Sequence, residues 1–253
     1  MNSSSGLSPS GLNDPCFVPL GPTVIIVPAR AGDVGQGDGG KSGEESFFLA
    51  DLASGRVIDP TLASAERQVA RGDITLILTT DSDAIADHVA ARQAGWLIRK
   101  RGQEESERGN SYFAVLDTAR RWAEEQSGKT FSTILVLEPS HPFRPVGLIT
   151  EAADLLAHNP ALDTAVSVVP EYGNLWVADS YGHLDRIQTR EGSVFYREIA
   201  GLTLMMRASC MDRGSLMGQD VGFIVVEEQW ALIDLHEPSG LAMARRFEGV
   251  LDL

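Results

Sequence analysis

The chain has 253 residues and a mass of 27.3 kDa, enough for one large α/β domain or two small ones. Hydrophobic residues make up 43% and charged residues 22%, a composition typical of globular proteins. The 35 acidic and 21 basic residues give a net charge of −14 and a pI near 4.7. This balance argues against a broad surface that binds nucleic acid or an anionic membrane, although a few Arg and Lys side chains can still hold a small anion.

Cysteine content and the N-terminal segment bear on where the protein works. Cys16 and Cys210 are too few and too far apart for a disulfide framework or a zinc knuckle. No stretch approaches the ~20 apolar residues of a membrane span. No signal peptide is predicted, because the first residues lack both basic charge and an apolar core. We therefore expect a cytoplasmic protein without nucleic-acid or membrane partners, in which residues 1–21 form a flexible leader and residues 22–253 one domain.

Short apolar runs alternate with helical patterns after residue 21. Runs without polar alternation are typical of strands buried on both faces, as in a parallel sheet. Strands that alternate with helices indicate right-handed βαβ crossovers. The sequence thus predicts an α/β fold with a doubly wound, mostly parallel sheet. The predicted strands are Thr23–Pro28, Ile74–Thr79, Thr133–Leu137, Thr164–Val169 and Leu202–Met206.

Helices are predicted between these strands. The first is expected to have Asp59 as its N-cap and Pro60 at its first helical position, and to run to Arg71. The second is expected to begin at Asp83 and to end at Gly95. The other two predicted helices are Tyr112–Glu125 and Pro145–His158.

The segment Tyr172–Arg197 interrupts this alternation. Its turn residues, such as Gly173, Gly182 and Gly192, separate pieces with extended character. We therefore expect a β-hairpin excursion from the sheet. It is either a surface hairpin or an arm that pairs with a second subunit, and the second interpretation predicts a homodimer.

The first predicted strand is followed by the glycine-rich loop Ala29–Ser46. Ligands of open parallel sheets bind at the carboxyl ends of strands, and here Arg30 and Lys41 would neutralise an anion held by backbone amides. Gly35–Ser42 also matches the Walker A pattern G-x-x-x-x-G-K-S. That motif needs the strand to run directly into its first glycine, whereas Pro28 ends the strand well before it. A P-loop kinase or NTPase is therefore the less favoured alternative.

A different interpretation of this loop starts from Pro28-Ala29-Arg30 and Lys41. They resemble the opening P-A-R-x-G-S-K-x-x-x-x-K-N of the sugar-acid cytidylyltransferases, the enzymes that make CMP-sialic acid and related CMP-sugars such as CMP-KDO. Further resemblances follow in chain order as far as about residue 244. They are Thr79–Ala86 for S-T-D-x-x-x-I-A; Gly95, Arg101, Glu104 and Ser111 for G…R-P-x-E-L…S; Glu138–Arg144 for Q-P-T-S-P-L-R; Gly201–Leu204 for N-G-A-I-Y; and Ile233–His236 for I-D-I-D-T.

The resemblance implies a Rossmann-like nucleotidyltransferase that transfers CMP from CTP to the anomeric hydroxyl of a 2-keto sugar acid and releases pyrophosphate. Such a displacement needs positioning and charge neutralisation more than covalent catalysis. The catalytic residues implied are Arg30 and Lys41, at the triphosphate, and Asp234. For Arg101 the alternative is a solvated basic patch with its neighbours, and for Ser111 it is a helix N-cap. The implied nucleotide contacts are Ala29, Arg30, Lys41, Arg101, Asn110 and Ser111.

The family holds Mg²⁺ with the two aspartates of D-x-D near the C-terminus. Only Asp234 matches here, and His236 replaces the second aspartate. Histidine is a poor magnesium ligand and a better one for softer metals. Asp234 and His236 are thus the implied metal positions, with Mg²⁺ as the expected cofactor, a shifted metal preference or impaired catalysis as alternatives. Asp81 is a further carboxylate, equally explained as a helix N-cap.

The sugar contacts depart most from the family. Glu138 stands where the family has Gln, and Ala200 where it has Asn. A carboxylate near an acidic sugar repels it unless Arg144 or a substrate amino group compensates, so we expect an unusual sugar acid. His141 is a further candidate, or simply a surface or capped histidine. The implied substrate contacts are Glu138, Ser140, Arg144 and Gly201.

These departures keep a third hypothesis open, a nucleotide-binding relative that performs no transfer. It would bind a nucleotide yet release no pyrophosphate with any sugar acid. The departing positions are Asp33, Val34, Ser42, Glu138, Ala200 and His236.

Overall fold

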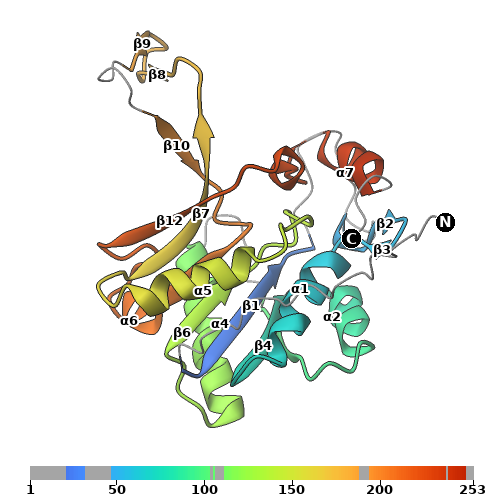
Figure 1. Ribbon diagram of the computed structural model, residues 1–253. Coiled ribbons are helices and arrows are strands. Elements are labelled where there is room, and N and C mark those ends of the chain that lie inside the picture. The colour runs from blue at the N-terminus through green and yellow to red at the C-terminus, as the bar shows by residue number, and fades with distance from the viewer. Residues whose placement is uncertain are drawn as a thin grey trace, which may run out of the picture.

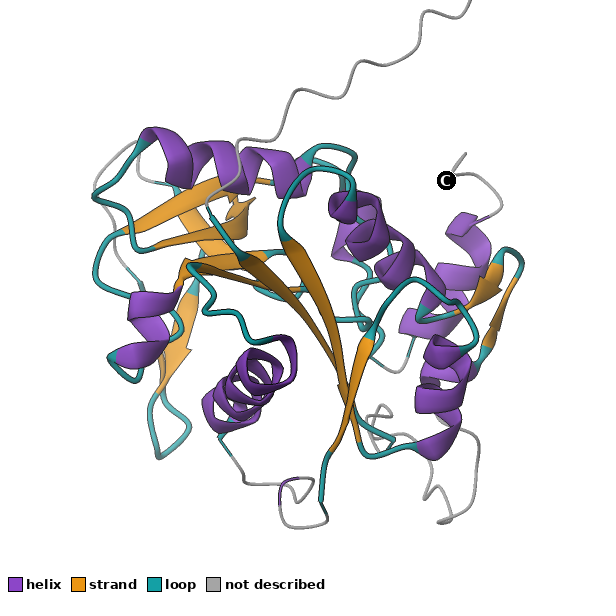
Figure 2. Ribbon diagram, turned by 90° about the horizontal axis from the view of Figure 1, so that it is seen from below, coloured by secondary structure: helices purple, strands orange, loops and turns teal. Residues whose placement is uncertain are grey.

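The structure is a computed structural model that describes residues 21–31, 47–102, 105, 111–187, 194–237 and 239–248. A central sheet lies between helices on its two faces (Figure 2). Within the described residues its eight strands run in the order β10-β7-β11-β6-β1-β4-β5, with β12 added on β7. Their bounds are β1 Thr23–Ala29, β4 Ile74–Thr80, β5 Leu97–Lys100, β6 Thr133–Val136, β7 Thr164–Glu171, β10 Phe195–Glu198, β11 Leu204–Arg207 and β12 Val221–Val225.

The helices contribute to two separate hydrophobic clusters, one on each face of the sheet. Side chains of α1, α2, α5 and α7 pack into the first cluster, and those of α4 and α6 into the second (Figure 1). The helices are α1 Asp59–Val69, α2 Asp83–Ala90, α4 Tyr112–Ser127, α5 Leu148–His158, α6 Ala208–Asp212 and α7 Gly240–Glu248, with short 3-10 turns η1 Phe47–Leu49 and η2 Gln229–Leu232.

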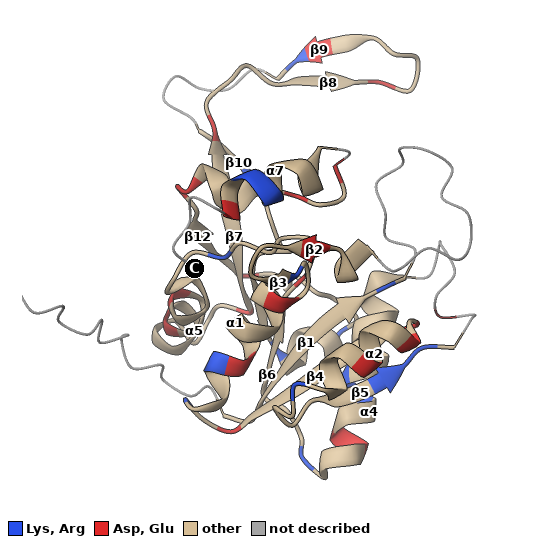
Figure 3. Ribbon diagram, turned by 90° about the vertical axis from the view of Figure 1, so that its right-hand side faces the viewer, with Lys and Arg blue, Asp and Glu red and all other residues tan. Residues whose placement is uncertain are grey.

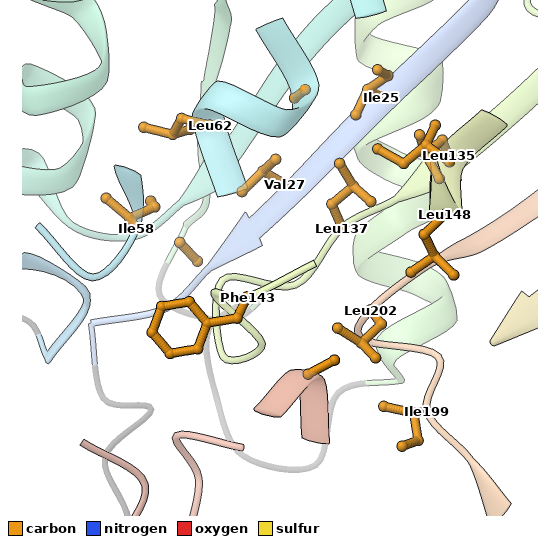
Figure 4. Close-up of a cluster of buried hydrophobic side chains, with 14 of the residues drawn as sticks. Ile25, Val27, Ile58, Leu62, Leu135, Leu137, Phe143, Leu148, Ile199 and Leu202 are labelled. Carbon is orange, nitrogen blue, oxygen red and sulfur yellow. The ribbon is translucent and has the colours of Figure 1, made fainter. Parts of the chain in front are cut away.

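Strand β1 shows why the apolar runs of the sequence are continuous. Ile25 and Val27 point into the cluster that contains α1 and α5, shown in Figure 4. Val24 and Ile26 point into the opposite cluster, beside α4. All four side chains have an exposed fraction of 0%. Both faces of the central strand therefore select apolar residues, as predicted for a doubly wound sheet.

The predicted parallel sheet is confirmed, with one local exception. Strands β5, β4, β1 and β6 are parallel to their neighbours in this series, and β12 is parallel to β7. The run Leu202–Met206 forms β11, which is antiparallel to both β6 and β7, and β10 is antiparallel to β7. The chain returns to the sheet from the excursion without a crossover helix, and such a direct return gives an antiparallel strand.

Two predicted helix boundaries were wrong. Asp59 lies inside α1, and Ile58 is the N-cap, because the Asp59 carboxylate accepts a hydrogen bond from the backbone N of Arg56 in the preceding turn at 2.7 Å. Helix α2 ends at Ala90 rather than at Gly95. The remaining predicted helices are present, with ends shifted by up to three residues.

The predicted β excursion is present as a projecting arm (Figure 1). It carries a separate two-stranded antiparallel sheet, formed by β8 Trp176–Ala178 and β9 Leu184–Arg186. A second small sheet, β2 Asp51–Leu52 with β3 Gly55–Arg56, precedes α1. The predicted leader lies outside the described residues except for Gly21. In the part of the chain that is described, no helix is both long and apolar enough to cross a membrane.

Candidate functional site

The topology brings the predicted site segments to one edge of the sheet. Because β1, β4, β5 and β6 are parallel, their carboxyl ends meet at the same edge. Strand β11 runs the other way, so the loop before it also lies at this edge. Two groups of side chains form there. We call them the β1 cluster (Ala29, Arg30, Asp81 and Arg101) and the β6 cluster (Tyr112, Glu138, Ser140, His141, Gly201 and Asp234).

Arg101 reaches across the sheet edge to the end of β1. Its backbone N donates to the carbonyl of Thr80 at 2.8 Å, which extends the pairing of β5 with β4. Its Nη2 donates to the carbonyl of Ala29 at 2.8 Å. Two arginines, Arg30 and Arg101, are therefore held at the end of the first strand, a place suited to an anionic ligand.

The neighbours of Arg101 have other partners. Arg99 donates to both carboxylate oxygens of Glu105, at 2.7 and 2.9 Å, and lowers the pKa of Glu105. Lys100 forms an ion pair with Asp83 of α2. Figure 3 shows the blue, basic end of β5 beside α2, which carries red, acidic segments. Of the three consecutive basic residues at and just after the end of β5, Arg101 is the one whose side chain reaches β1.

Asp81 anchors the start of the glycine-rich loop. Its Oδ1 accepts a hydrogen bond from the backbone N of Ala31 at 2.7 Å. The alternative role as a helix N-cap was wrong, since Ser82 caps α2 and its Oγ accepts from the backbone N of Ile85 at 3.3 Å. Asp81 therefore ties the ends of β1 and β4 together next to Arg30.

The β6 cluster is a chain of hydrogen bonds that joins three segments. Glu138 accepts from the Tyr112 hydroxyl at 2.5 Å through Oε1 and from the Ser140 hydroxyl at 3.4 Å through Oε2. Ser140 Oγ is also 3.1 Å from His141 Nδ1. The carbonyl of Ser140 accepts from the backbone N of Leu235 at 2.9 Å. The start of α4, the loop after β6 and the turn that carries Asp234 are thus connected.

Position 201 requires glycine because neighbouring side chains leave no room for a Cβ atom, and not because the backbone adopts a positive φ. A Cβ atom built on it would lie 2.5 Å from His141 Nδ1 and 3.0 Å from Glu138 Oε2. The Gly201 carbonyl accepts from the backbone N of Glu138 at 3.0 Å. The loop before β11 therefore lies directly against the loop after β6, and any side chain at this position would separate them.

The Arg144 side chain is buried, and its hydrogen bonds go to other segments of the protein. Its Nε donates to Leu202 O at 2.8 Å, and its Nη1 to Thr61 Oγ1 of α1 at 2.7 Å. Its Nη2 donates to the carbonyls of Glu138 at 2.6 Å and Gly201 at 2.9 Å. Burial lowers the pKa of this guanidinium to about 9, so the group still carries its charge at neutral pH. The structure shows Arg144 as a brace between three segments, and its contact with a substrate stays a prediction.

Asp234 and His236 contact each other in the turn between η2 and α7. Asp234 Oδ1 accepts from the backbone N of His236 and lies near its Nδ1, each at 2.9 Å. Burial raises the pKa of Asp234, but these two hydrogen bonds outweigh it and hold the pKa below the ordinary value. Burial lowers the pKa of His141, although Asp234 and Glu138 act in the opposite direction. His141 is therefore neutral at pH 7.

Binding of a magnesium ion shared with a phosphate ligand stays a prediction for this site. The described residues contain no group of three or more His, Cys, Asp or Glu side chains that could hold a metal by itself. Mg²⁺ commonly uses one or two carboxylates and completes its shell with water and substrate phosphates. Asp234, whose side chain is 33% exposed, can supply such a carboxylate, whereas the His236 ring is turned to Asp234. A direct role of His236 in metal binding stays a prediction.

Several predicted site residues lie outside the described residues. Ser111 is described, and it occupies the N-cap position of α4 without a capping hydrogen bond from its side chain. The alternative interpretation, that Ser111 is a helix N-cap, is thus confirmed for its place in the chain. The predicted positions outside the described residues are Asp33, Val34, Lys41, Ser42, Glu104 and Asn110, as is the whole Walker-like stretch Gly35–Ser42.

Sequence reasoning missed two residues that organise this site. Tyr112 was predicted only as the start of a helix, yet its hydroxyl binds Glu138. Thr61 carries no motif, yet it accepts from Arg144. For Tyr112 the one available signal was its place directly after Ser111, and for Thr61 there was none.

Comparison with known proteins reveals similarity in structure alone. No family model matches the sequence, and no curated protein matches it. A CMP:2-keto-3-deoxy-manno-octonic acid synthetase complexed with CTP matches with a TM-score of 0.60 and 13% identity, over 90% of this chain and 99% of the other. The chain therefore has the same Rossmann-like α/β fold as this synthetase.

Two 4-diphosphocytidyl-2C-methyl-D-erythritol synthases have the same architecture. The enzyme from Anaerococcus prevotii matches with a TM-score of 0.57 and 12% identity, over 89% of this chain and 95% of the other. A second such enzyme matches with a TM-score of 0.60 and 14% identity, over 89% of this chain and 97% of the other. Both kinds of neighbour have names that specify a cytidylyl product, and at these identities the similarity establishes the fold.

Proposed function

We propose that this protein is a cytidylyltransferase that transfers CMP from CTP to a hydroxyl of a sugar acid and releases pyrophosphate. The observation that carries the proposal is the position of Arg101, whose Nη2 reaches Ala29 O and so lies beside Arg30 at the end of β1. Two guanidinium groups at the carboxyl edge of a nucleotidyltransferase sheet suit a triphosphate. Structural neighbours whose names specify CMP or diphosphocytidyl products support CTP as the nucleotide.

The two clusters divide the work of the reaction. Arg30 and Arg101 neutralise the triphosphate and the departing pyrophosphate. Asp234 would hold Mg²⁺, which when bound supplies positive charge to the phosphates. The β6 cluster faces the acceptor and orients the attacking hydroxyl. No covalent intermediate with the protein is needed.

Two alternatives make different predictions. A P-loop kinase or NTPase depends on Lys41 and is indifferent to Arg30. A relative without catalytic activity binds CTP but releases no pyrophosphate with any sugar acid. The hydrogen-bonded order of the β6 cluster favours the transferase, because a nucleotide site alone does not need it.

Pyrophosphate release from CTP, measured with a panel of 2-keto sugar acids and Mg²⁺, tests the proposal. We expect turnover by the wild-type protein, a loss of at least about a hundredfold in Arg101→Ala and Asp234→Asn, and near wild-type rates in Arg99→Ala, whose side chain is turned to Glu105. Full activity in both site variants would contradict the proposal. Thermal stabilisation by ATP rather than CTP would favour the P-loop alternative, and stabilisation by CTP without turnover would favour the non-catalytic relative.

We further propose that the protein is a cytoplasmic homodimer in which the arm pairs with a second subunit. The hairpin β8–β9 presents large apolar side chains to solvent, among them Trp176 and Leu184, with exposed fractions of 57% and 63%. Apolar side chains grouped on a projecting hairpin are typical of an interaction surface.

A further inference from the structure

Glu138 lies at the centre of the β6 cluster and forms no ion pair with any Lys or Arg in the part of the chain that the structure describes. We propose that the acceptor carries an amino group and that Glu138 binds it as an ammonium ion. This inference rests on the proposed cytidylyltransferase function and names the substrate class of the same site.

The carboxylate of Glu138 is held in place from several directions. Oε1 accepts from Tyr112 and Oε2 from Ser140. The backbone N of Glu138 donates to Gly201 O, and its carbonyl accepts from Arg144. The side chain is partly buried, and its Oε2 lies close to Gly201. Glu138 is therefore preorganised, which is typical of a group that recognises a ligand.

The charge of the nearest basic group, Arg144, interacts with the Glu138 carboxylate through space, but Arg144 donates no hydrogen bond to it. Arg144 uses four N–H groups for Leu202 O, Thr61 Oγ1, Glu138 O and Gly201 O, and none of these bonds goes to the Glu138 carboxylate. His141 lies beside Ser140 and is neutral, because burial lowers its pKa. Within the described residues, no Lys or Arg forms an ion pair with Glu138.

The Glu138 carboxylate already has two hydrogen-bond donors from the protein, and both are uncharged. Tyr112 and Ser140 are hydroxyls, so they satisfy hydrogen-bonding capacity without supplying positive charge. A partly buried carboxylate gains most from a cation that also donates hydrogen bonds. A substrate carboxylate would be repelled, and a further hydroxyl would only repeat what the protein supplies. An ammonium group supplies both the charge and the hydrogen-bond donors.

Asp234, the other carboxylate of the β6 cluster, has a different expected ligand. We expect that carboxylate to bind Mg²⁺ together with the nucleotide phosphates. The acceptor's own carboxylate would have to be bound by other groups of the site, and Glu138 selects for the amino group at another position of the same molecule.

A matched acceptor series tests the inference. The series is 2-keto-3-deoxy-manno-octonic acid, its analogues with one hydroxyl at C4, C5, C7 or C8 replaced by an amine, and the N-acetylated form of each amine. Pyrophosphate release from CTP gives kcat/KM for every member with the wild-type protein, Glu138→Gln and Tyr112→Phe. Glu138→Gln keeps the size of the side chain and removes its charge. Tyr112→Phe removes one hydrogen bond and keeps the charge.

We expect one amine to exceed both its hydroxyl parent and its N-acetyl form by at least about tenfold in the wild-type protein, which corresponds to one ion-pair-assisted hydrogen bond. Glu138→Gln should abolish this preference, while Tyr112→Phe should keep it at a lower rate. Equal or faster turnover of the parent or the N-acetyl forms would overturn the inference and leave the proposed function intact. A preference that survives in Glu138→Gln would also overturn it. No turnover of any member would contradict the proposed function itself, and the inference with it.

Discussion

The guanidinium of Arg144 donates a 2.9 Å hydrogen bond to the carbonyl of Gly201, 57 residues further along the chain. The same guanidinium nitrogen, Nη2, also binds the carbonyl of Glu138. The loop after β6 and the loop before β11 are therefore held by a single buried side chain. Both loops contribute to the β6 cluster, so the geometry of the candidate acceptor site depends on Arg144.

Replacement of Arg144 by Met should destabilise the protein by about 3 kcal/mol or more. The substitution removes the hydrogen bonds that a buried, charged guanidinium donates to four acceptors, and each such bond contributes about 1.5–3 kcal/mol. Arg144→Lys should lose less, because it keeps a charged donor, but one ammonium cannot reach all of these acceptors. The free energy of unfolding in urea measures both losses.

Arg121 provides the matched control for this prediction. Its side chain is 63% exposed and pairs with Asp117 on the surface of α4. Arg121→Met should lose much less stability than Arg144→Met, because an exposed ion pair contributes little. A similar small loss for Arg144→Met would show that its hydrogen bonds do not hold the two loops.

Gly201→Ala should impair turnover more than it impairs folding. The new Cβ would lie 2.5 Å from His141 Nδ1, so the His141 and Glu138 side chains must move. Overpacking of this kind costs typically about 1–3 kcal/mol of stability. We expect a fall in kcat/KM for the acceptor with a folded protein that still binds CTP. Gly173→Ala is the control, since nothing lies within 4 Å of a Cβ atom there.

Stability should fall as the pH decreases below about 6.5, in part because of His141. Burial lowers the pKa of His141 in the folded protein below the ordinary histidine value of about 6.5. The unfolded chain therefore binds a proton at a pH at which the folded chain does not, and the free energy of unfolding rises with pH between the two pKa values. The contribution is complete above the unfolded pKa and is lost as the pH falls towards the folded one.

Urea unfolding at pH 7.5 and pH 5.5 checks this sign. His141→Gln should lose less stability between the two pH values than the wild-type protein. His158→Gln removes an exposed histidine of α5 and should behave as the wild-type protein does. Identical pH dependence in His141→Gln and the wild-type protein would contradict the assignment.

Trp176→Ser together with Leu184→Ser should convert a dimer into a monomer. Both side chains are exposed on the projecting hairpin, and their burial between subunits would supply a large part of the association energy. Sedimentation velocity of the wild-type and variant proteins gives the molecular mass. Val146→Ser removes an even more exposed apolar side chain outside the arm, at 85% exposure, and should leave the mass unchanged. A monomeric wild-type protein would refute the proposed arm interface.

The strands of the sheet were largely predictable because a strand that is buried on both faces has a continuous run of apolar residues in the sequence. Residues 24–27 and 76–78 are apolar without interruption, and both runs lie in central parallel strands. The direction of β11 was not predictable, since a short apolar run has the same pattern in either orientation. The N-cap of α1 was misplaced because the Asp59 carboxylate binds the preceding turn rather than the helix end.

The candidate site was predictable in its positions but not in its contacts. Sequence motifs pointed to Arg101, Glu138 and Gly201 at the ends of strands, and the fold brings these ends to one edge. Motifs could not distinguish a side chain that contacts substrate from one that braces the chain, as Arg144 does in this structure. Nor could they reveal that the Tyr112 hydroxyl would meet Glu138.

The sequence by itself determined the class of fold and the order of the segments that carry polar residues, because hydrophobic periodicity and turn residues act over short stretches of chain. Only the tertiary structure decided which polar groups meet. The hydrogen bonds of Arg144 join residues as far as 83 positions apart, and such pairings depend on how β6, β11 and α1 pack together. That packing sets both the direction of each guanidinium N–H and the absence of a protein cation at the Glu138 carboxylate within the described residues.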